Sequence, residues 1–572
     1  MKIYVNQMGY LPGSSKTAIL ALEGTKDAPI PEAPGKVQIC AKSGTYMLEK
    51  EALFFGWDEA SGDFVWQVDF SEIQAPGSYE IRWQGQTSYP FSIGSHLYNE
   101  LHTLLSKALY FQRCGMALEE PYAGHFARKT CHLAPSVLWS EYEKCMAGEM
   151  EEADMQHFDI RGGWHDAGDY GRYPTAAACA LAHILYAYRF FPGAFEGTLN
   201  IPESGRDIPD ILSECLYELK WMLQMQNEEG GVYHKQCTLR HANFVMPCED
   251  REQMYLYPVS SLAVADFTAV MALASRIYRP FEEDFADQAL AAALKSYDWL
   301  QKHPEFLGFH NPEETNTGEY GDSSDRDERM WAAMELYRCT GEEHYLTEAR
   351  EIFDTLSSTT EFGWGDVSGF AGWALLEAKL MEDYGNILGT TTSTPISAAE
   401  ADFCRLYETA FLKEAERLLE TLSGSGYGVA LSPREFCWGS NMVVLNRAML
   451  FGTAYLLEPK KTYTDAVVRQ MDYILGVNGA DYSYVTGVGA HAFCNPHNRV
   501  TVADDIDETI PGFVSGGPNG RPADEKAEWL IRPGTAPMKC YLDIWECYSL
   551  NEITIYWNSP AIFAAAFLSV IK

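Results

Sequence analysis

A chain of 572 residues, 47% of them hydrophobic and 13% aromatic, can bury a large core, so a mainly disordered protein is excluded. Eighty acidic residues against 43 basic ones give a net charge of −37 at pH 7. Such a field repels nucleic acid and anionic membranes, and it suits a neutral or cationic ligand. A soluble acidic surface explains the same charge more simply than electrostatic steering does.

The cysteines and the first residues bear on the cell compartment. Fourteen cysteines are scattered without a repeating framework, which favours free thiols and a metal site over a disulfide scaffold. The start, MKIYVNQMGYLP, has no apolar segment typical of a secretory signal, and no run of eighteen apolar residues occurs. We therefore expect no membrane span and a cytoplasmic protein, or a secreted one if a signal peptide has been removed.

Residues 1–94 alternate in the manner of β-strands. The segments KIYVNQ, KVQICA, DFVWQVDF and GSYEIRW are short, rich in β-formers and separated by Gly, Pro and Asp turns. This pattern predicts a small β-sandwich.

From about Leu97 the apolar spacing becomes helical and stays so to the end. In ILSECLYELKWMLQMQN, for example, Leu212, Leu216 and Leu219 lie on one helical stripe. Long Gly-, Pro- and aromatic-rich loops separate these helices, and long ordered loops usually carry function. We therefore predict a large helical domain over residues 95–572.

The segment GGWHDAGDYGRY places Asp166 and Asp169 three residues apart in a glycine-bounded turn. Two ionised carboxylates repel each other, so the pair needs a use or a counter-ion. Both side chains could converge on one water and deprotonate it. A calcium loop or two helix-capping aspartates would explain the same spacing. The aromatic neighbours Trp164, Tyr170 and Tyr173 favour a sugar-binding role.

A second candidate is Glu552, in YLDIWECYSLNEITIYWNSP. A carboxyl group among Tyr548, Tyr556 and Trp557 is desolvated, which favours its neutral form and makes it a proton donor. A glutamate in the first turn of the last helix, stabilised by the helix dipole, is the alternative that the residues alone favour.

Four segments resemble glycoside hydrolase family 9. The C-terminal signature of that family is similar to a set of seven residues here: Tyr541, Asp543, Tyr548, Glu552, Thr554, Asn558 and Ser559. A second signature resembles SYVTGVGAHAFCNPHNR, with matches at Ser483, Val485, Thr486, Gly489, Pro496, His497 and Arg499. GGWHDAGDYGRY resembles a third element, and IYVNQMGYLPGSSKTAIL resembles the immunoglobulin-like module that precedes many catalytic domains of the family. Two positions depart from the family pattern, His491 and His165.

The resemblance implies a mainly α fold, an (α/α)6-barrel catalytic domain preceded by a small all-β immunoglobulin-like sandwich. It implies an endoglucanase or cellodextrinase that cleaves β-1,4-glucosidic bonds with inversion. Asp169 would be the general base, Asp166 would help to hold the attacking water, and Glu552 would be the general acid. An inverting glycosidase keeps acid and base about 6.5–9.5 Å apart so that water fits beneath the sugar.

The resemblance also implies substrate contacts. His497 and Arg499 would bind sugar hydroxyls, and Tyr548 and Trp438 would stack on sugars or form the cleft wall. GGVYHKQC looks like a family loop near the cleft, so we expect His234, and more weakly Lys235, to contact substrate. Ordinary structural roles remain the alternative for each of them.

RCGMALEEPYAGHFARKTCH contains Cys114, Cys131 and His132, which suit tetrahedral zinc with a fourth ligand from elsewhere. From chemistry alone, two buried cysteines beside a surface histidine would explain them. The resemblance implies a structural zinc that pins the aspartate loop, with His157 as the expected fourth ligand and His125 as the alternative.

TNTGEYGDSSDRDERMWAA concentrates carboxylates before a helix, where hard oxygen ligands suit calcium. A negatively charged helix start is the alternative. The resemblance implies a calcium site formed by Ser323, Asp327 and Glu328 together with a distant aspartate, for which we choose Asp366. No organic cofactor is expected.

Two other functions remain open. An exo-β-glucosaminidase acting on chitosan oligomers would keep the fold and mechanism, and the acidic charge would attract its cationic substrate. A non-catalytic carbohydrate-binding protein is disfavoured because all three carboxylates are present. The expected partner is a β-1,4-linked saccharide, with neither nucleic acid nor membrane, and the oligomeric state is not predicted.

Overall fold

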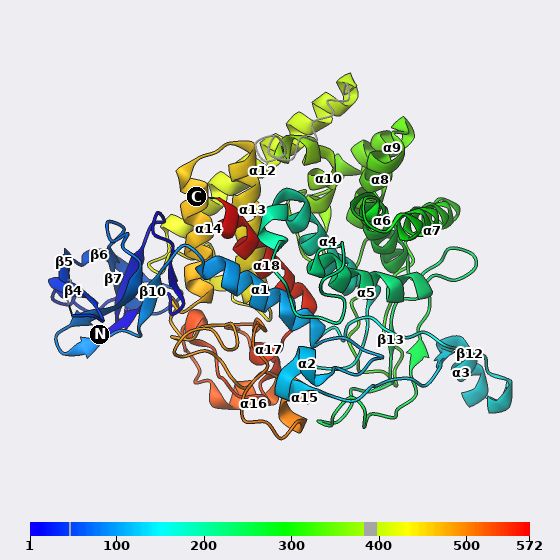
Figure 1. Ribbon diagram of the computed structural model, residues 1–572, viewed down its shortest axis with the longest axis horizontal. Helices are drawn as coiled ribbons and strands as arrows, with labels where there is room; N and C mark the ends of the chain where they lie inside the picture. The colour runs from blue at the N-terminus through cyan, green and yellow to red at the C-terminus, as the bar shows by residue number, and fades with distance from the viewer. Residues whose placement is uncertain (45–46, 382–396, 572) are drawn as a thin grey trace. The chain divides into compact units, whose positions relative to one another are not determined.

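The computed structural model describes residues 1–44, 47–381 and 397–571. They form two compact units (Figure 1). Unit 1 comprises Met1–Ala108, Leu412–His497 and Ile506–Lys572, and unit 2 comprises Leu109–Phe411 and Asn498–Asp505. Each unit therefore combines stretches that are far apart in the sequence.

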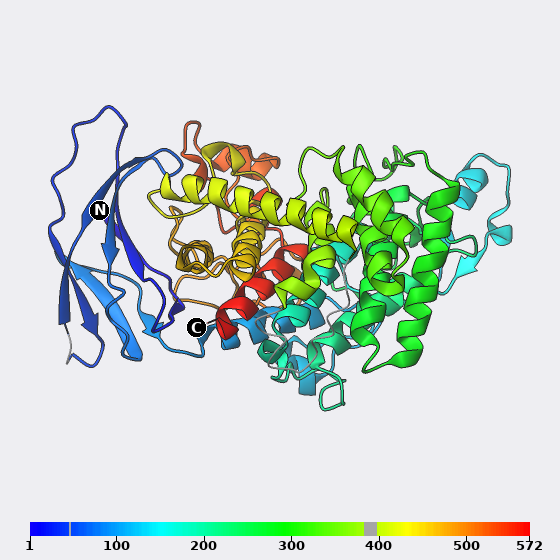
Figure 2. The same ribbon diagram turned by 90° about the horizontal axis from the view of Figure 1, so that it is seen from above.

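Unit 1 begins with the predicted β-sandwich (Figure 2, blue strands). One sheet has the order β1-β3-β7-β6 and the other the order β2-β10-β8-β4-β5, with β9 paired to β8. Buried residues of both sheets, such as Leu20, Trp66, Val37 and Ile81, form one apolar cluster between them. The strands are β1 (Lys2–Tyr4), β2 (Gly9–Tyr10), β3 (Thr17–Glu23), β4 (Lys36–Ala41), β5 (Met47–Glu51), β6 (Leu53–Asp58), β7 (Asp63–Asp69), β8 (Gly77–Trp83), β9 (Gln86–Thr87) and β10 (Phe91–Ile93).

The sandwich is joined to the helical part of unit 1 by buried polar contacts. The Asn6 amide donates to Asp472 Oδ1 (2.8 Å), and Gln7 N donates to Leu475 O (2.9 Å). At the start of β7, Asp63 forms an ion pair with Lys539 at 2.6 Å. Compact unit 1 therefore extends past the sandwich, and the domain boundary at residue 94 stays a prediction.

The helical part of unit 1 has α13 at its centre, packed against α14 and α18. The last helix is apolar on nearly all sides and almost fully buried, as a helix without a polar face must be. The helices are α1 (Leu97–Tyr110), which ends in unit 2, η4 (Pro433–Glu435), α13 (Ser440–Leu457), α14 (Lys461–Ile474), α16 (Glu525–Leu530), η5 (Pro537–Lys539), α17 (Tyr548–Asn551) and α18 (Ile555–Val570).

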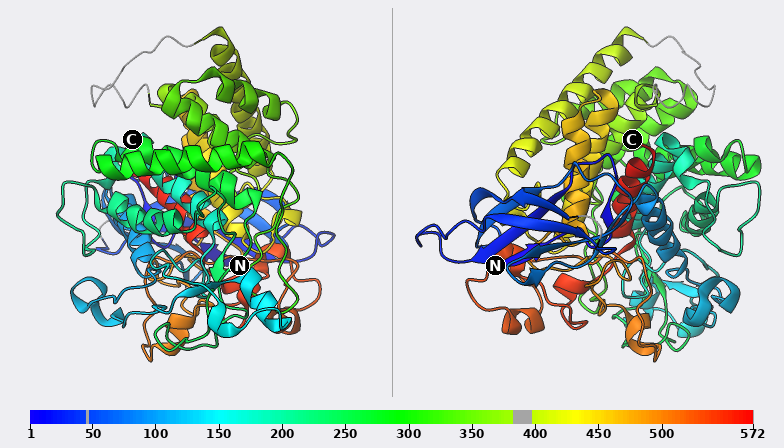
Figure 3. Two further views of the ribbon diagram at one scale, coloured as in Figure 1. Left: turned by 90° about the vertical axis from the view of Figure 1, so that its right-hand side faces the viewer. Right: turned by 60° about the vertical axis from the view of Figure 1, so that its left-hand side comes forward.

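Unit 2 alternates inner and outer helices (Figure 3, green helices). The inner helices α4, α6, α8 and α10 are largely buried and pack in succession, whereas α5, α7 and α9 are amphipathic and cover them. Such alternation is typical of α/α architecture, so the prediction of a mainly helical fold behind a β-sandwich is confirmed. The longer helices are α4 (Pro174–Phe190), α5 (Asp210–Gln224), α6 (Ser261–Tyr278), α7 (Glu283–Lys302), α8 (Arg326–Thr340), α9 (Glu343–Phe353), α10 (Ser368–Leu380) and α12 (Ala398–Ser423), which continues into unit 1.

Short elements and loops complete unit 2. A small sheet has the order β12-β11-β14-β13. By length and hydropathy α6 alone among the described helices could cross a membrane, but 94% of it is buried inside the fold, as expected for a core helix. The short elements are α2 (Glu120–Ala123), η1 (Gly124–Phe126), β11 (Ser136–Leu138), α3 (Trp139–Met146), η2 (Glu152–Asp154), β12 (His157–Phe158), η3 (Pro192–Phe195), β13 (Gln236–Cys237), β14 (Tyr255–Leu256) and α15 (Arg499–Ala503).

Candidate active site

The aspartate loop, residues 162–173, runs between β12 and α4 in unit 2. Gly163 has φ +76°, and a Cβ added to it would lie 2.7 Å from the ring of Trp221, so only glycine fits. The next residue, Trp164, is buried; its backbone N–H donates to Glu218 and its indole N–H donates to Glu214 (2.9 Å). The glycine therefore lets the chain press against Trp221 and turn the following residues inward.

A buried ion cluster supports this loop from behind. The Arg113 guanidinium is fully buried and donates to both oxygens of Glu214 and of Glu203, at 2.9–3.1 Å. Glu214 in turn accepts the indole proton of Trp164. Charged groups survive burial only when they are paired and hydrogen-bonded in this way, so the cluster fixes the position of the loop.

Asp166 is 3% exposed and accepts a hydrogen bond from the Tyr320 hydroxyl through Oδ2. Its other oxygen, Oδ1, is buried and has no hydrogen-bond partner in the part of the chain that the structure describes. Burial raises the pKa of Asp166 well above its ordinary value, and the charge of Asp169 raises it further. An orphaned acceptor on a buried carboxyl suits a bound water.

Asp169 has the opposite electrostatic environment. His241 Nδ1 lies 3.1 Å from Asp169 Oδ2. Burial alone would raise the pKa of Asp169, but the hydrogen bond and charge of His241, together with the charge of Arg499, hold it below its ordinary value. The pKa values of two carboxyls in one loop are therefore displaced in opposite directions, a separation typical of groups with different parts in proton transfer.

Arg499 lies at the start of α15, and its side chain is 5% exposed. Its Nε donates to Ala242 O (2.7 Å) and its Nη1 to Gly168 O (3.0 Å). The predicted sugar ligand thus has two nitrogens committed to backbone carbonyls on either side of the Asp169–His241 pair. These bonds hold the backbone next to Asp169 and His241, and sugar binding by Arg499 stays a prediction.

Glu552 belongs to unit 1 and lies between α17 and α18. Helix α18 is capped by the side chain of Thr554, which accepts from Trp557 N. Glu552 therefore precedes α18 and is not its N-cap; it is the C-cap of α17. The alternative, a glutamate in the first turn of the last helix, does not describe its position. Glu552 is half-buried, less desolvated than the aromatic sequence around it indicated.

Three of the predicted substrate contacts surround Glu552. Trp438 Nε1 donates to Glu552 Oε2 (3.1 Å), and the rings of Trp438 and Tyr548 lie 5.3 Å apart. His497 forms an isolated backbone bridge with Glu552. Its Nδ1 donates to Trp545 O (2.7 Å), and its ring lies 5.7 Å from that of Tyr548. The structure thus brings the predicted acid together with His497, Tyr548 and Trp438.

His234 is a correction. Its side chain is fully buried and stacks on Phe309 at 4.0 Å. Nε2 donates to Glu319 O and Nδ1 accepts from the Ser260 hydroxyl, each at 2.7 Å. Burial lowers the pKa of His234 to about 3, so it is neutral. Both ring nitrogens are used inside the protein, so the predicted substrate contact is wrong; Lys235, also buried, ties down the same loop.

Comparison with known families decides the assignment. The family described as "Glycosyl hydrolase family 9" matches residues 98–565, and "Cellulase N-terminal ig-like domain" matches residues 1–88. The chain belongs to glycosyl hydrolase family 9. The resemblance inferred from the sequence motifs is thereby confirmed.

Relatives of this family 9 hydrolase match along its full length. A cellodextrinase of Butyrivibrio fibrisolvens is 39% identical, with 98% of each chain covered. A structure of AaCel9A in complex with a cellobiose-like isofagomine has a TM-score of 0.86 and 31% identity, covering 100% of both chains. A Zn-binding triple mutant of the family 9 endoglucanase J30 has a TM-score of 0.84 and 29% identity, covering 98% of this chain and 100% of the other.

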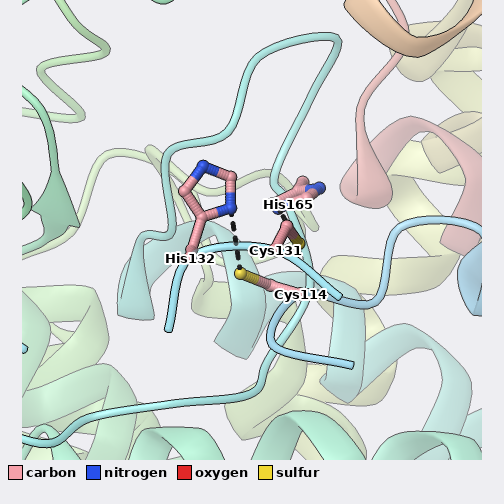
Figure 4. Close-up of side chains that lie close together, drawn as sticks. All are labelled: Cys114, Cys131, His132 and His165. Atoms are coloured by element: carbon pink, nitrogen blue, oxygen red, sulfur yellow. Dashed lines mark hydrogen bonds between the residues drawn. The ribbon is translucent and has the colours of Figure 1, made fainter. Parts of the chain in front are cut away.

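Cys114, Cys131, His132 and His165 form the candidate metal site of the hydrolase (Figure 4). Their ligand atoms lie within 4.8 Å of one another, and His132 Nδ1 is 3.6 Å from Cys114 Sγ. His132 Nε2 donates to Asp250 (3.3 Å), the outer contact that orients a metal-binding imidazole. Two thiols and two imidazoles suit a closed tetrahedral zinc site, so the donor set fits the expected structural metal.

The fourth member of this group is His165, which corrects the choice of His157. His157 lies in β12, paired with Val137 of β11, and its side chain is exposed. His125, the alternative, is exposed in η1. The turn at the loop glycines carries His165 inward instead, one residue before Asp166.

The predicted calcium residues lie around the start of α8. Asp327 and Glu328 are buried there, and Asp366 is half-buried, whereas Ser323 is exposed. Burial raises the pKa of Asp327 to about 6, and the charge of Asp366 raises it as well. Carboxylates gathered in this way repel one another unless a bound cation or bound protons neutralise them.

A residue missed by the sequence analysis joins this group. Asp266, in the middle of α6, is 1% exposed, and among the described residues neither of its carboxylate oxygens has a hydrogen-bond partner. Orphaned buried carboxylate oxygens fit the hard ligand set of calcium. Asp266 went unnoticed because it stands alone in an apolar helix.

His241 and Tyr320, the partners of the two aspartates, were also missed. Each belongs to a loop that lies far from the aspartates in sequence, so no spacing rule connects them. The only available signal was chemical: a carboxylate pair needs a donor or a counter-ion, and both loops are rich in polar and aromatic residues.

Proposed function

We propose that this family 9 hydrolase cleaves β-1,4-glucosidic bonds of short glucan chains with inversion of the anomeric carbon. The observation that carries the proposal is the geometry of two buried carboxyls in one loop: Asp166 is held by Tyr320 and keeps its Oδ1 without a partner among the described residues, and Asp169 is paired with His241 at 3.1 Å. The names of its relatives support the substrate class: one is a cellodextrinase, and another binds a cellobiose-like inhibitor.

On the base side, the ionised Asp169 takes a proton from water as the oxygen of that water attacks the anomeric carbon. Asp166 holds the water through its free Oδ1 while Tyr320 fixes Oδ2. His241 and Arg499 keep Asp169 ionised and aimed.

On the acid side, Glu552 in its protonated form gives its proton to the leaving glycosidic oxygen as the C–O bond breaks. The indole N–H of Trp438 points at Oε2 and stabilises the carboxylate that remains. The atoms balance: water supplies hydroxide to one sugar and Glu552 supplies the proton to the other. Before the next turnover, Asp169 loses its proton to solvent and Glu552 takes one up.

Two metals would support this machinery. A zinc held by Cys114, Cys131, His132 and His165 would crosslink the segments next to the aspartate loop. A calcium held among Asp327, Glu328 and Asp366, with Asp266 nearby, would neutralise buried charge below the loop that carries Tyr320. Neither takes part in a proton transfer.

The test is to offer the purified protein cellotetraose and to follow products by proton NMR from the first minutes. We expect the α-anomer to appear first; the β-anomer first would contradict inversion. Parallel samples of carboxymethyl cellulose and of the β-1,4-linked glucosamine tetramer separate endoglucanase from cellodextrinase and test the glucosaminidase alternative. Turnover of the glucosamine tetramer alone would overturn the glucan substrate.

A further inference from the structure

Two exposed tryptophans stand out in unit 1. The chain has 14 tryptophans, all among the described residues, and the exposed ones are Trp438 (44%) and Trp529 (77%). Tryptophan has the largest apolar surface of any side chain and is seldom left in water without a use. Trp438 already has a role beside Glu552. Trp529 has none in the mechanism above.

Trp529 lies close to the acid region through Tyr548. Together they line a cavity of about 350 Å³, whose other walls are Asp524, Glu525, Lys526 and Glu546. Tyr548 also contacts Trp438, and the centroids of these two rings lie 5.3 Å apart. Trp438 in turn bonds to Glu552, so Trp438 and Tyr548 connect Glu552 with this cavity.

The cavity is held in shape by Asp524, which is 3% exposed. Its Oδ1 accepts from Ala527 N (2.7 Å) and caps α16, the helix that carries Trp529. Its Oδ2 accepts from Ser549 N (3.0 Å) in α17, next to Tyr548. One carboxylate thus fixes the two aromatic residues relative to each other, so the platform is formed before any ligand arrives.

The charges at the cavity restrict what it can hold. Asp524, Glu525 and Glu546 outnumber the single cation Lys526, which lies 3.7 Å from Glu546. An anionic ligand is repelled, whereas a neutral ring with many hydroxyls finds carboxylate acceptors at its edge and an indole for its apolar face.

We propose that this cavity is a sugar subsite in which Trp529 stacks against a glucopyranosyl ring of the leaving chain. The inference rests on the proposed function, because it assigns the ring to the side of the bond that Glu552 protonates. The acid gives its proton to the departing sugar, and the aromatic path starts at that acid. Longer chains then gain binding energy that short or aryl substrates cannot.

The test compares kcat/KM for cellopentaose with kcat/KM for 4-nitrophenyl β-cellobioside, which has no sugar in its leaving group. In Trp529→Ala we expect the ratio of the two values to fall about tenfold, the size of one lost stacking contact. Trp529→Phe keeps an aromatic face and should restore much of the ratio. Phe281→Ala, which removes an aromatic side chain 36% exposed in the turn after α6, is the control and should keep the wild-type ratio.

Binding gives a second measurement. In the Glu552→Gln background, which does not consume the ligand, titration calorimetry with cellopentaose should show weaker binding when Trp529 is also changed to Ala. An unchanged ratio, or an equal loss on both substrates, overturns the subsite. A wild-type enzyme that is inactive on both substrates would instead refute the proposed function. The two failures are therefore distinguishable: the activity of the wild type tests the function, and the ratio in the variants tests the subsite.

Discussion

The aspartate loop of unit 2 and the Glu552 region of unit 1 differ in how firmly their surroundings hold them. Asp166 and Asp169 are almost fully buried, and a buried ion cluster supports their loop. Glu552 is half-buried, and the groups around it are an exposed tryptophan, Tyr548 and His497. The proposed mechanism accounts for this difference: a base that directs one water needs a rigid frame, whereas an acid that meets different leaving sugars can lie at a more open surface.

The largest expected effects come from the carboxylates themselves. Asp169→Asn removes the base and should lower kcat on cellotetraose by about 10³-fold. Glu552→Gln should lose a similar factor on cellotetraose but much less on 2,4-dinitrophenyl β-cellobioside, whose leaving group needs no proton. Steady-state kinetics on both substrates checks this difference. Equal recovery of both variants on the activated substrate would contradict the division of roles.

The next prediction concerns the rigid frame. Glu214→Gln leaves the buried guanidinium of Arg113 with an incomplete partner, and we expect unfolding free energy to fall by about 3–5 kcal/mol. Glu546→Gln, which breaks an ion pair at the surface of unit 1, should cost about 0–1 kcal/mol. Urea denaturation followed by circular dichroism measures both. Similar losses for the two variants would remove the contrast between the regions.

Metal removal should act on stability before activity. His165→Ala, or prolonged chelation, should lower the melting temperature, by roughly 2–4 °C for each kcal/mol of stability lost. Turnover at low temperature should persist, because the proposed zinc takes no part in the chemistry. His157→Ala, at an exposed strand, is the matched control and should melt like wild type. Complete loss of activity with an unchanged melting curve would indicate a catalytic metal.

The smallest effect is expected from His241→Asn. His241 holds the pKa of Asp169 below its ordinary value, and the base must be ionised to act. Removing the histidine therefore raises the pKa of Asp169 and moves the acidic limb of the kcat/KM profile to higher pH, with little change at neutral pH. A pH profile on cellotetraose tests this shift. An unmoved acidic limb would mean that Arg499 and the loop backbone suffice.

Features that depend on short-range sequence patterns were predicted from the sequence. Alternation located the sandwich, and apolar periodicity located the helices. The motifs identified the family, which the full-length match confirms. The two cysteines and His132 were also predicted to bind a metal, and the structure places them together in a group that could hold one.

The remaining errors concern residues whose side-chain direction depends on the three-dimensional path of the chain. His157 and His165 both follow His132 within a short distance, and only the pairing of β12 and the turn at Gly163 determine which side chain points inward. The sequence indicates that His234 is a polar loop residue, but both of its ring nitrogens are hydrogen-bonded inside the protein, to Ser260 and Glu319. Trp529 belongs to no family motif quoted above, and its significance rests on Asp524 linking two short helices.

The discontinuity of unit 1 has a consequence for biosynthesis. Unit 2 is encoded mainly by the single stretch Leu109–Phe411, so its core can form while the ribosome is still translating. Unit 1 needs both ends of the chain, because Asn6 and Gln7 bond to residues that emerge several hundred codons later. Glu552 belongs to the late stretch. A nascent chain thus acquires the aspartate loop well before Glu552, and the proposed hydrolysis needs both.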